Sequence, residues 1–295
     1  NWRRGLFILG MSIVPLLHFL VFYVYVNFNS VLMGFQVLEG GDLVWSLENF
    51  SLFFSQITDT ETIIFQAFGN TMIFFAVQLL VIMPLTTFIA YFIYKRILGY
   101  KFYRVIFFLP TILSTVVLTI LYSNILGVKG PIAWLVQRIA GTPVPPEFFA
   151  DSRYALWAIV LYVIWTGFGT STMMYLGAMS GISDSVVEAA ELDGVTPLKE
   201  LWYITVPMIW PTFMTFVVVG FTGLFTNQIN LYNFYGDQAE YRYYTFGYYL
   251  YISIRNASIG EYSYLAALGL LLTAVAAPLT LLLRKAMNKF GPKTI

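Results

Sequence analysis

The sequence predicts an all-α polytopic membrane protein with six transmembrane helices and both termini in the cytoplasm. The first observation is compositional: 59% of the 295 residues are hydrophobic and 11% are charged, whereas soluble domains carry roughly 25% charged residues. The second is a set of six long stretches without Asp, Glu, Lys or Arg, and the third is a one-sided distribution of Lys and Arg. A net charge of +1 and the absence of cysteine indicate no nucleic-acid partner, disulfide framework or thiolate metal site.

Each stretch is long enough to cross a bilayer, because a spanning helix needs about 20 apolar residues. The first stretch follows Trp2, Arg3 and Arg4 as a signal peptide would, but its apolar run is too long and no small-residue cleavage site closes it. We therefore expect it to be retained, and we expect a short segment to precede Asn1, which is not a Met. The predicted helices cover residues 5–28, 71–94, 105–126, 154–178, 212–232 and 263–283.

The orientation follows from Lys and Arg, which accumulate on cytoplasmic flanks of membrane helices. With a cytoplasmic amino terminus, 11 of the 16 Lys and Arg residues fall on the cytoplasmic side, and the first outer loop contains none. Both termini are therefore predicted to be cytoplasmic. No soluble domain, linker or repeat between the two halves is visible, so one membrane domain is predicted over residues 1–295.

Four prolines lie inside or at the edge of predicted helices: Pro15, Pro84, Pro110 and Pro278. Each removes a helix hydrogen bond and bends its helix. Two interpretations stay open at this point. The bends can surround a cavity, or they can reflect the ordinary abundance of proline in membrane helices.

The connection of residues 181–211 is acidic, unlike the other predicted cytoplasmic segments. Its acidic residues stand against Lys199 alone, which indicates a basic protein surface as the counterpart. The acidic residues are Asp184, Glu188, Glu191, Asp193 and Glu200.

A helix, a turn and a second helix are predicted within this connection. Ser185 and Glu188 have the spacing of a capping box, which predicts a helix start at that point. Gly194 permits a sharp turn, and Thr196 followed by Pro197 is typical of a second helix start. Three apolar residues of the second helix are predicted to share one face: Leu198, Leu201 and Trp202.

The same connection carries a spaced motif. It reads Glu188-Ala189-Ala190, three residues, Gly194, nine residues, then Ile204-Thr205-Val206-Pro207. This pattern resembles the EAA loop of binding-protein-dependent ABC importer permeases, which is E-A-A, x3, G, x9, I-x-L-P, with Val206 in place of Leu. The resemblance implies the type I importer permease fold. We call residues 181–211 the coupling segment, because in that family the loop forms the helix that seats in a groove of the ATPase subunit.

The resemblance also implies roles for individual residues of the coupling segment. Glu188 would face the ATPase subunit and Gly194 would make the turn. The alternative that Glu188 only caps its helix stays open, and both roles can hold together. The predicted ATPase-coupling residues are Glu188, Ala189, Ala190, Gly194, Leu198, Leu201, Trp202 and Pro207.

Further segments look like the carbohydrate branch of that family, the maltose and glycerol-phosphate type permeases. They are Leu47-Glu48-Asn49-Phe50, Asn70-Thr71, Leu109-Pro110 and Leu192-Asp193-Gly194. One departure lies in an outer loop, where Tyr235-Gly236-Asp237-Gln238 replaces a Thr-Gly-Gly-Pro-like turn. The resemblance covers nearly the whole chain.

No Gly-x4-Gly-Lys-Ser/Thr phosphate loop occurs in the sequence, so the chain is predicted to be no enzyme and to bind no cofactor itself. The resemblance implies ATP and Mg on two copies of a partner ATPase subunit. It also implies a second permease subunit, an extracytoplasmic solute-binding protein and a prokaryotic cytoplasmic membrane. The predicted function is uptake of a sugar or oligosaccharide.

Two alternative functions stay open. The same permease class could carry another small solute, such as a polyamine or a phosphate ester. An ion-coupled carrier or an intramembrane enzyme would need ionisable groups inside the helices, and the predicted helices offer only His18, which we interpret as a packing or hydrogen-bonding residue. No metal-binding cluster is visible in the sequence.

A sugar path requires amides, hydroxyls and flat aromatic faces. Asn227, Gln228 and Asn230 lie in the fifth predicted helix, where the two asparagines would be about one turn apart. By resemblance, Gly167 and Asn227 fall where the maltose-type family lines its translocation path. The alternative that the amides bond neighbouring helices stays open. The predicted path residues are Trp165, Gly167, Thr170, Asn227, Gln228 and Asn230.

Six tyrosines surround the last outer loop. Amphipathic rings favour the membrane interface, so an aromatic belt is predicted, with docking of a binding protein as the alternative. These residues are Tyr241, Tyr243, Tyr244, Tyr248, Tyr249 and Tyr251.

Overall fold

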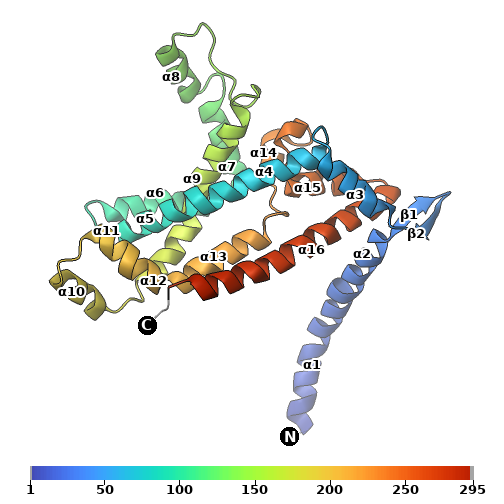
Figure 1. Ribbon diagram of the computed structural model, residues 1–295, viewed down its shortest axis with the longest axis horizontal. Helices are drawn as coiled ribbons and strands as arrows, with labels where there is room; N and C mark the ends of the chain where they lie inside the picture. The colour runs from blue at the N-terminus through green and yellow to red at the C-terminus, as the bar shows by residue number, and fades with distance from the viewer. Residues whose placement is uncertain (1, 293–295) are drawn as a thin grey trace. The chain divides into compact units, whose positions relative to one another are not determined.

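A computed structural model describes residues 2–292 of the chain (Figure 1). The chain forms two compact units. Asn1–Phe65 and Leu250–Val275 form the first unit, and Gln66–Tyr249 with Ala276–Ile295 form the second. The prediction of one membrane domain over residues 1–295 stays a prediction, and the two units are described in turn.

The first unit begins with a long helix and a hairpin. Gly40 and Gly41 make the turn between its two strands at φ +61° and +103°, which glycine adopts without steric cost. Asn49 supports the hairpin, because its Nδ2 donates a hydrogen bond to the Gln36 carbonyl over 2.8 Å. The elements are α1 (Trp2–His18), the π-helical η1 (Phe19–Tyr25), α2 (Val26–Gly34), antiparallel β1 (Gln36–Glu39) and β2 (Asp42–Trp45), and α3 (Glu48–Thr58).

The end of α2 packs closely on α16 (Ile259–Phe290). A methyl group at Gly34 would lie 3.2 Å from the Ala267 backbone and 2.7 Å from a methyl group of Leu270. The Tyr264 hydroxyl also donates to Gln56 Oε1 over 2.6 Å, which joins α16 to α3. The first half of α16 therefore holds the first unit together.

The second unit is a helical assembly around one long helix, α9 (Ala155–Met179). Both α5 and α6 pack along α9, and Gly169 has no room for a side chain because the Thr111 methyl and the Phe107 carbonyl face it. The remaining elements are α4 (Ile63–Val77), π-helical η2 (Gln78–Ile82), α5 (Met83–Tyr94), α6 (Tyr100–Ile112), α7 (Thr115–Leu126), α8 (Pro131–Ala140), α10 (Asp184–Leu192), α11 (Pro197–Glu200), π-helical η3 (Leu201–Thr205), α12 (Val206–Met208), α13 (Trp210–Thr222), α14 (Leu231–Tyr235), 3-10 helical η4 (Tyr241–Tyr243) and α15 (Phe246–Asn256). The start of α4, up to Phe65, and the part of α15 from Leu250 onward belong to the first unit.

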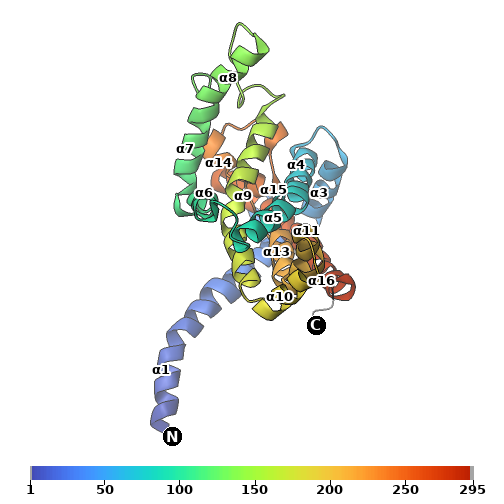
Figure 2. The same ribbon diagram turned by 90° about the vertical axis from the view of Figure 1, so that its left-hand side faces the viewer.

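Helices α8 and α10 lie at opposite ends of α9, as Figure 1 and the turned view of Figure 2 both show. The coupling segment, which includes α10, is thus separated from α8 by the length of α9. A helix rises 1.5 Å per residue, so the 25 residues of α9 span about 38 Å. That length suffices to cross the hydrocarbon core of a bilayer, which is about 30 Å thick.

The predicted membrane helices are largely confirmed in the described residues. Five helices are long and apolar enough to cross a membrane, and a bent pair would make a sixth. Trp2–Gly34, Ile63–Tyr94, Ala155–Met179 and Gly260–Phe290 correspond to the first, second, fourth and sixth predicted helices. The predicted cytoplasmic position of the termini stays a prediction.

The third predicted helix, residues 105–126, is wrong as one continuous element. Helix α6 ends at Ile112 and α7 begins at Thr115, with Leu113 and Ser114 extended between them. The Ser114 hydroxyl accepts a hydrogen bond from the Val117 amide over 3.3 Å and so caps α7. A capping serine satisfies an amide that a continuous helix would pair itself. The long apolar helix here is Thr115–Ala140.

The fifth predicted helix, residues 212–232, is also wrong as one element. Helix α13 ends at Thr222, and Ile229 and Asn230 adopt left-handed backbone angles, with φ of +54° and +57°. On its other side, α13 meets the preceding helix at a bend of 71°. Pro211 explains this bend, because proline lacks the amide that would pair with the carbonyl four residues earlier.

Candidate functional site

The coupling segment forms the predicted helix, turn and helix. Gly194 makes the turn at φ +70°. The Gly194 amide donates to the Glu191 carbonyl over 3.1 Å and the Val195 amide donates to the Ala190 carbonyl over 3.0 Å. These two bonds make a Schellman motif, which ends a helix at a left-handed glycine. Thr196 then precedes Pro197 at the start of α11, as predicted.

The predicted capping box is wrong. Helix α10 begins at Asp184, and its N-cap residue is Ser183 rather than Ser185. The hydroxyl groups of Ser183 and Ser185 are hydrogen-bonded to each other instead. Ser183 has extended backbone angles, so it is the last residue outside the helix and takes the capping position. Glu188 consequently lies within the helix, with its side chain exposed.

The predicted apolar face of the second helix is also wrong in one residue. Leu198 and Trp202 are 53% and 59% exposed, but Leu201 is 1% exposed and points into the core. Ala190 is buried as well, whereas Ala189 is exposed and Pro207 is half-buried. Sequence analysis missed the exposed Leu192 and Tyr203, which widen the apolar surface of the segment. An exposed leucine directly before the turn glycine was the signal that could have found the first of them.

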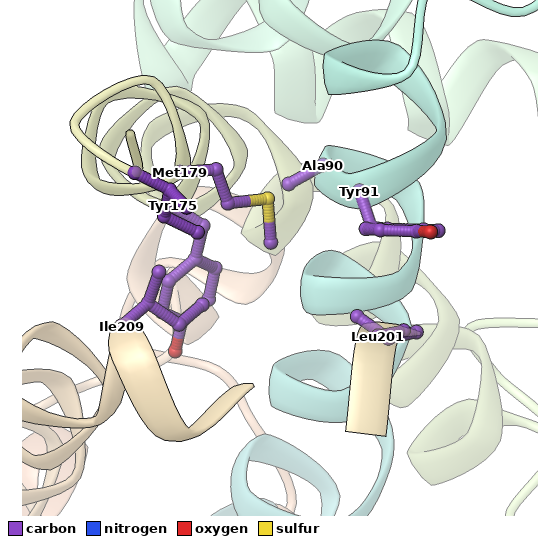
Figure 3. Close-up of a cluster of buried hydrophobic side chains, with 7 residues drawn as sticks. Ala90, Tyr91, Tyr175, Met179, Leu201 and Ile209 are labelled. Carbon is purple, nitrogen blue, oxygen red and sulfur yellow. The ribbon is translucent and has the colours of Figure 1, made fainter. Parts of the chain in front are cut away.

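A buried cluster fixes the coupling segment to three helices of the second unit. Leu201 from the segment packs together with side chains from α5 and α9 and from the bend before α13 (Figure 3). Val186 and Val187 of α10 pack against the same cluster. The cluster thus packs the coupling segment against the ends of these helices. The buried members are Ala90, Tyr91, Tyr175, Met179, Ile182, Leu201 and Ile209.

Two of the five acidic residues of the segment, Glu191 and Glu200, pair with Lys95, and Glu200 is turned away from the open surface. Lys95, at the end of α5, lies 2.9 Å from Glu200 Oε2 and 3.2 Å from Glu191 Oε1. The Glu200 side chain is 4% exposed. The expectation that Glu200 contributes to a surface for a basic partner is therefore wrong. Burial lowers the pKa of Lys95, but the hydrogen bonds and charges of Glu200 and Glu191 outweigh burial, so its pKa is raised.

Asn227 lines a cavity of about 280 Å³ next to the break after α13. The polar lining groups are uncharged, and Phe74 and Phe75 supply aromatic faces. Sequence analysis missed the other polar lining residues; an amide within the apolar stretch of residues 71–94 was the signal for one of them. They are Thr71, Gln78 and Thr245.

The two asparagines do not share a helix face, contrary to the prediction. The Asn227 Oδ1 accepts a hydrogen bond from the Ile229 amide over 2.9 Å, and Asn230 Oδ1 accepts one from Asn233 Nδ2 over 3.2 Å. Asparagine tolerates the left-handed region and bonds nearby backbone, which favours a break over a helix. The structure thus places Asn227 at an irregular segment of the cavity wall.

The other predicted path residues do not gather around Asn227. The Trp165 ring stacks on the Tyr122 ring, and the two ring centroids are 6.0 Å apart. Trp165 also lines a separate, mainly apolar cavity of about 640 Å³. Gly167 packs against Ile82, and Thr170 is exposed. The Oε1 atom of Gln228 is buried without a hydrogen-bond partner among the described residues.

The predicted aromatic belt is wrong for half of its members. Tyr243, Tyr244 and Tyr248 are buried, while Tyr241 and Tyr251 are exposed. Asn70 of α4 holds this region, because its Nδ2 donates to the carbonyl of Arg242 over 2.7 Å and to that of Tyr244 over 2.9 Å. The three buried tyrosines therefore pack inside the protein next to α4 instead of forming a belt at the membrane interface.

We expect Asn70→Ala to lower the free energy of unfolding by about 1–3 kcal/mol, because two carbonyls lose their donor in a buried site. Thermal unfolding of the purified chain in detergent measures the effect. Asn27→Ala is the matched control, since Asn27 Nδ2 bonds only the exposed Tyr23 carbonyl, over 2.6 Å. The free energy of unfolding of this control should stay within about 0.5 kcal/mol of that of the original protein. Equal losses in both variants would contradict the role of Asn70.

A family model described as binding-protein-dependent transport system inner membrane component matches residues 82–294. The chain belongs to this family. The permease is therefore a multi-pass membrane protein, and its apolar helices agree with that membership.

Curated relatives of the permease are named for carbohydrate transport. It is 27% identical to the lactose transport system permease protein LacF of Rhizobium radiobacter, and the match spans 59% of each chain. It is also 27% identical to YteP of Bacillus subtilis, a polygalacturonan/rhamnogalacturonan transport system permease protein, over 97% of this chain and 89% of that protein.

A solved structure shares the fold of the permease. It belongs to a bacterial ABC transporter involved in the import of the acidic polysaccharide alginate, and matches with a TM-score of 0.80 over 98% of this chain and 97% of that chain. The identity is 19%, so this likeness concerns the fold. The predicted importer permease fold is thereby confirmed.

Proposed function

We propose that this permease is the membrane subunit of an ATP-driven importer that takes up a sugar or oligosaccharide. A solute-binding protein outside the cell would deliver the cargo, and a second permease subunit would complete the pathway. Two ATPase subunits would hold ATP and Mg in the cytoplasm. The single observation that carries the proposal is the coupling segment, which presents an exposed acidic and apolar surface while Leu201 anchors it in the core.

The segment would let a subunit without a phosphate loop respond to ATP that is bound by its partner. Closure of the two ATPase subunits would move Glu188, Leu198 and Trp202 as one surface. The buried cluster would pass this displacement to the ends of α5, α9 and α13. Packed cores shift between discrete arrangements rather than deform gradually, so such a displacement can open one side of the pathway and close the other.

The cavity beside Asn227 supports a neutral sugar as cargo. Its lining offers amides, hydroxyls and two phenyl rings without a charged side chain. Sugars are bound by hydrogen bonds and by aromatic faces, whereas a polyamine or a phosphate ester calls for ionised partners. The names of the relatives LacF and YteP, which refer to lactose and polygalacturonan/rhamnogalacturonan, agree with a carbohydrate cargo.

We expect Glu188→Lys combined with Gly194→Pro to abolish copurification of the ATPase subunits. The first change reverses the charge of the exposed surface, and the second removes the left-handed turn and the Gly194 amide bond. The measurement is the amount of ATPase subunit that is retained by the tagged permease. Glu147→Lys, an exposed carboxylate between α8 and α9, is the control and should retain the subunit. Normal retention by the double variant would contradict the docking role.

The cargo is tested separately on the partner binding protein. A neutral oligosaccharide, an acidic oligosaccharide and a polyamine are compared for binding to it. Preference for the neutral oligosaccharide supports the proposal, and tight binding of only the polyamine would favour the alternative solute class. Uptake into vesicles without the ATPase subunits, driven by an ion gradient, would instead indicate a carrier.

A further inference from the structure

Helix α5 is joined to the coupling segment only through noncovalent contacts. The chain itself connects the segment to α9 on one side and to α13 on the other, since residues 180–183 and Ile209 link them directly. Helix α5 lies far earlier in the sequence. It therefore needs side-chain contacts to follow any movement of the segment.

The polar part of this contact is the Lys95 fork, which we define as Lys95 with Glu191 and Glu200. Lys95 reaches Glu191 of α10 at 3.2 Å and Glu200 of α11 at 2.9 Å, so one ammonium group joins both arms of the helix-turn-helix. Only 22% of the Lys95 side chain is exposed. The second carboxylate oxygen of Glu200, Oε1, is buried without a hydrogen-bond partner among the described residues. Lys95 is thus the cation that compensates this carboxylate.

The other end of the same continuous helix lines the cavity. Residues Ile63–Tyr94 form one helix without a chain break, and Thr71, Phe74, Phe75 and Gln78 from it line the cavity beside Asn227. About five helical turns separate Gln78 from Lys95. A displacement of the segment that pulls on Lys95 would accordingly shift the cavity wall.

We infer that Lys95 is a positioning residue that couples the coupling segment to the cavity wall through α5. Two ion pairs, one with each arm, keep α5 in register with the segment, whichever way the segment moves. The neighbouring apolar cluster packs α5 against the segment without a preferred direction, whereas the charged fork fixes the register of α5. This inference rests on the proposed function, since it requires ATPase subunits that move the segment.

The test follows the cavity wall directly. The chain contains no cysteine, so Gln78→Cys gives one reactive site on this subunit. The permease is purified as the complete complex, and the rate of maleimide labelling of this site is measured with and without MgATP and vanadate. In the Gln78→Cys background we expect ATP to change the labelling rate by at least about fivefold, the lower range for coupled sites.

Two changes at the fork and one control are compared in that background. Lys95→Met should bring the labelling ratio close to one while the ATPase subunits remain bound, and Lys95→Arg, which keeps the charge, should preserve the ratio. Lys101→Met, an exposed lysine in α6, is the control and should leave the ratio unchanged. A full ATP-dependent change in the Lys95→Met complex would overturn the inference.

A neutral pair separates positioning from folding. Lys95→Met leaves Glu200 buried without compensation and can prevent folding; Lys95→Met with Glu200→Met removes both charges. If Lys95 positions α5, this double variant also loses the ATP-dependent change. If the double variant keeps the full change, the fork serves folding alone and the inference is wrong. Absence of ATPase subunits from the unaltered complex would instead contradict the proposed function.

Discussion

Trp202→Ala is expected to weaken binding of the ATPase subunit by roughly thirtyfold while leaving the fold intact. Trp202 is 59% exposed on the coupling segment, and loss of an aromatic anchor at the centre of an interface typically costs about 2 kcal/mol or more. Each 1.4 kcal/mol corresponds to a factor of ten in affinity. The measurement is titration of the ATPase subunit onto the immobilised permease complex, together with thermal unfolding of the permease alone.

Leu201→Ala, one position earlier, should instead lower the stability of the permease. Its side chain is 1% exposed within the cluster of Tyr91, Tyr175 and Met179. Truncation of a buried leucine removes about 2–5 kcal/mol of stability, because it leaves a cavity. The unfolding temperature of Leu201→Ala should fall clearly, and that of Trp202→Ala should not. A destabilised Trp202→Ala with unchanged ATPase affinity would show that this residue belongs to the fold rather than to the docking surface.

The contrast between these two neighbours shows what the sequence can and cannot predict. The spacing Leu198, Leu201, Trp202 identifies an apolar side of a regular helix. The π-helical η3 (Leu201–Thr205) changes the angular spacing, and Leu201 turns toward the core. Charge counting failed in a similar way at Glu200, because its partner Lys95 is about a hundred positions away in the sequence.

Two motifs with a local cause were predicted correctly, although the capping box of Ser185 and Glu188 was not. The Gly194 turn and the Thr196-Pro197 helix start depend on backbone preferences of the residues themselves, and the structure has both. Hydropathy likewise located most of the long helices. The helix breaks near Ser114 and Asn227 were missed because hydropathy does not register the hydrogen bonds that these side chains make with nearby backbone amides.

Gly247→Ala is expected to disrupt the cavity wall and to lower transport strongly, with ATPase binding unchanged. A methyl group on Gly247 would collide with the backbone carbonyl group of Asn227 and with the Thr226 carbonyl carbon. Backbone cannot rotate away as a side chain can, so the break that carries Asn227 must shift. Overpacking of this kind costs about 1–3 kcal/mol, and it displaces the polar group that faces the cavity.

Gly177→Ala is the matched control for this change. Gly177 lies in α9, and a methyl group there meets no atom within 4 Å apart from the neighbouring backbone of α9 itself. Alanine is a better helix former than glycine, so this variant should gain roughly 0.5–1 kcal/mol in stability. Transport of a labelled oligosaccharide into vesicles and thermal unfolding are measured for both variants. Normal transport by Gly247→Ala would mean that the position of Asn227 does not matter for passage of the cargo. Loss of ATPase binding in the same variant would instead place its effect on the whole fold, because Gly247 lies outside the coupling segment.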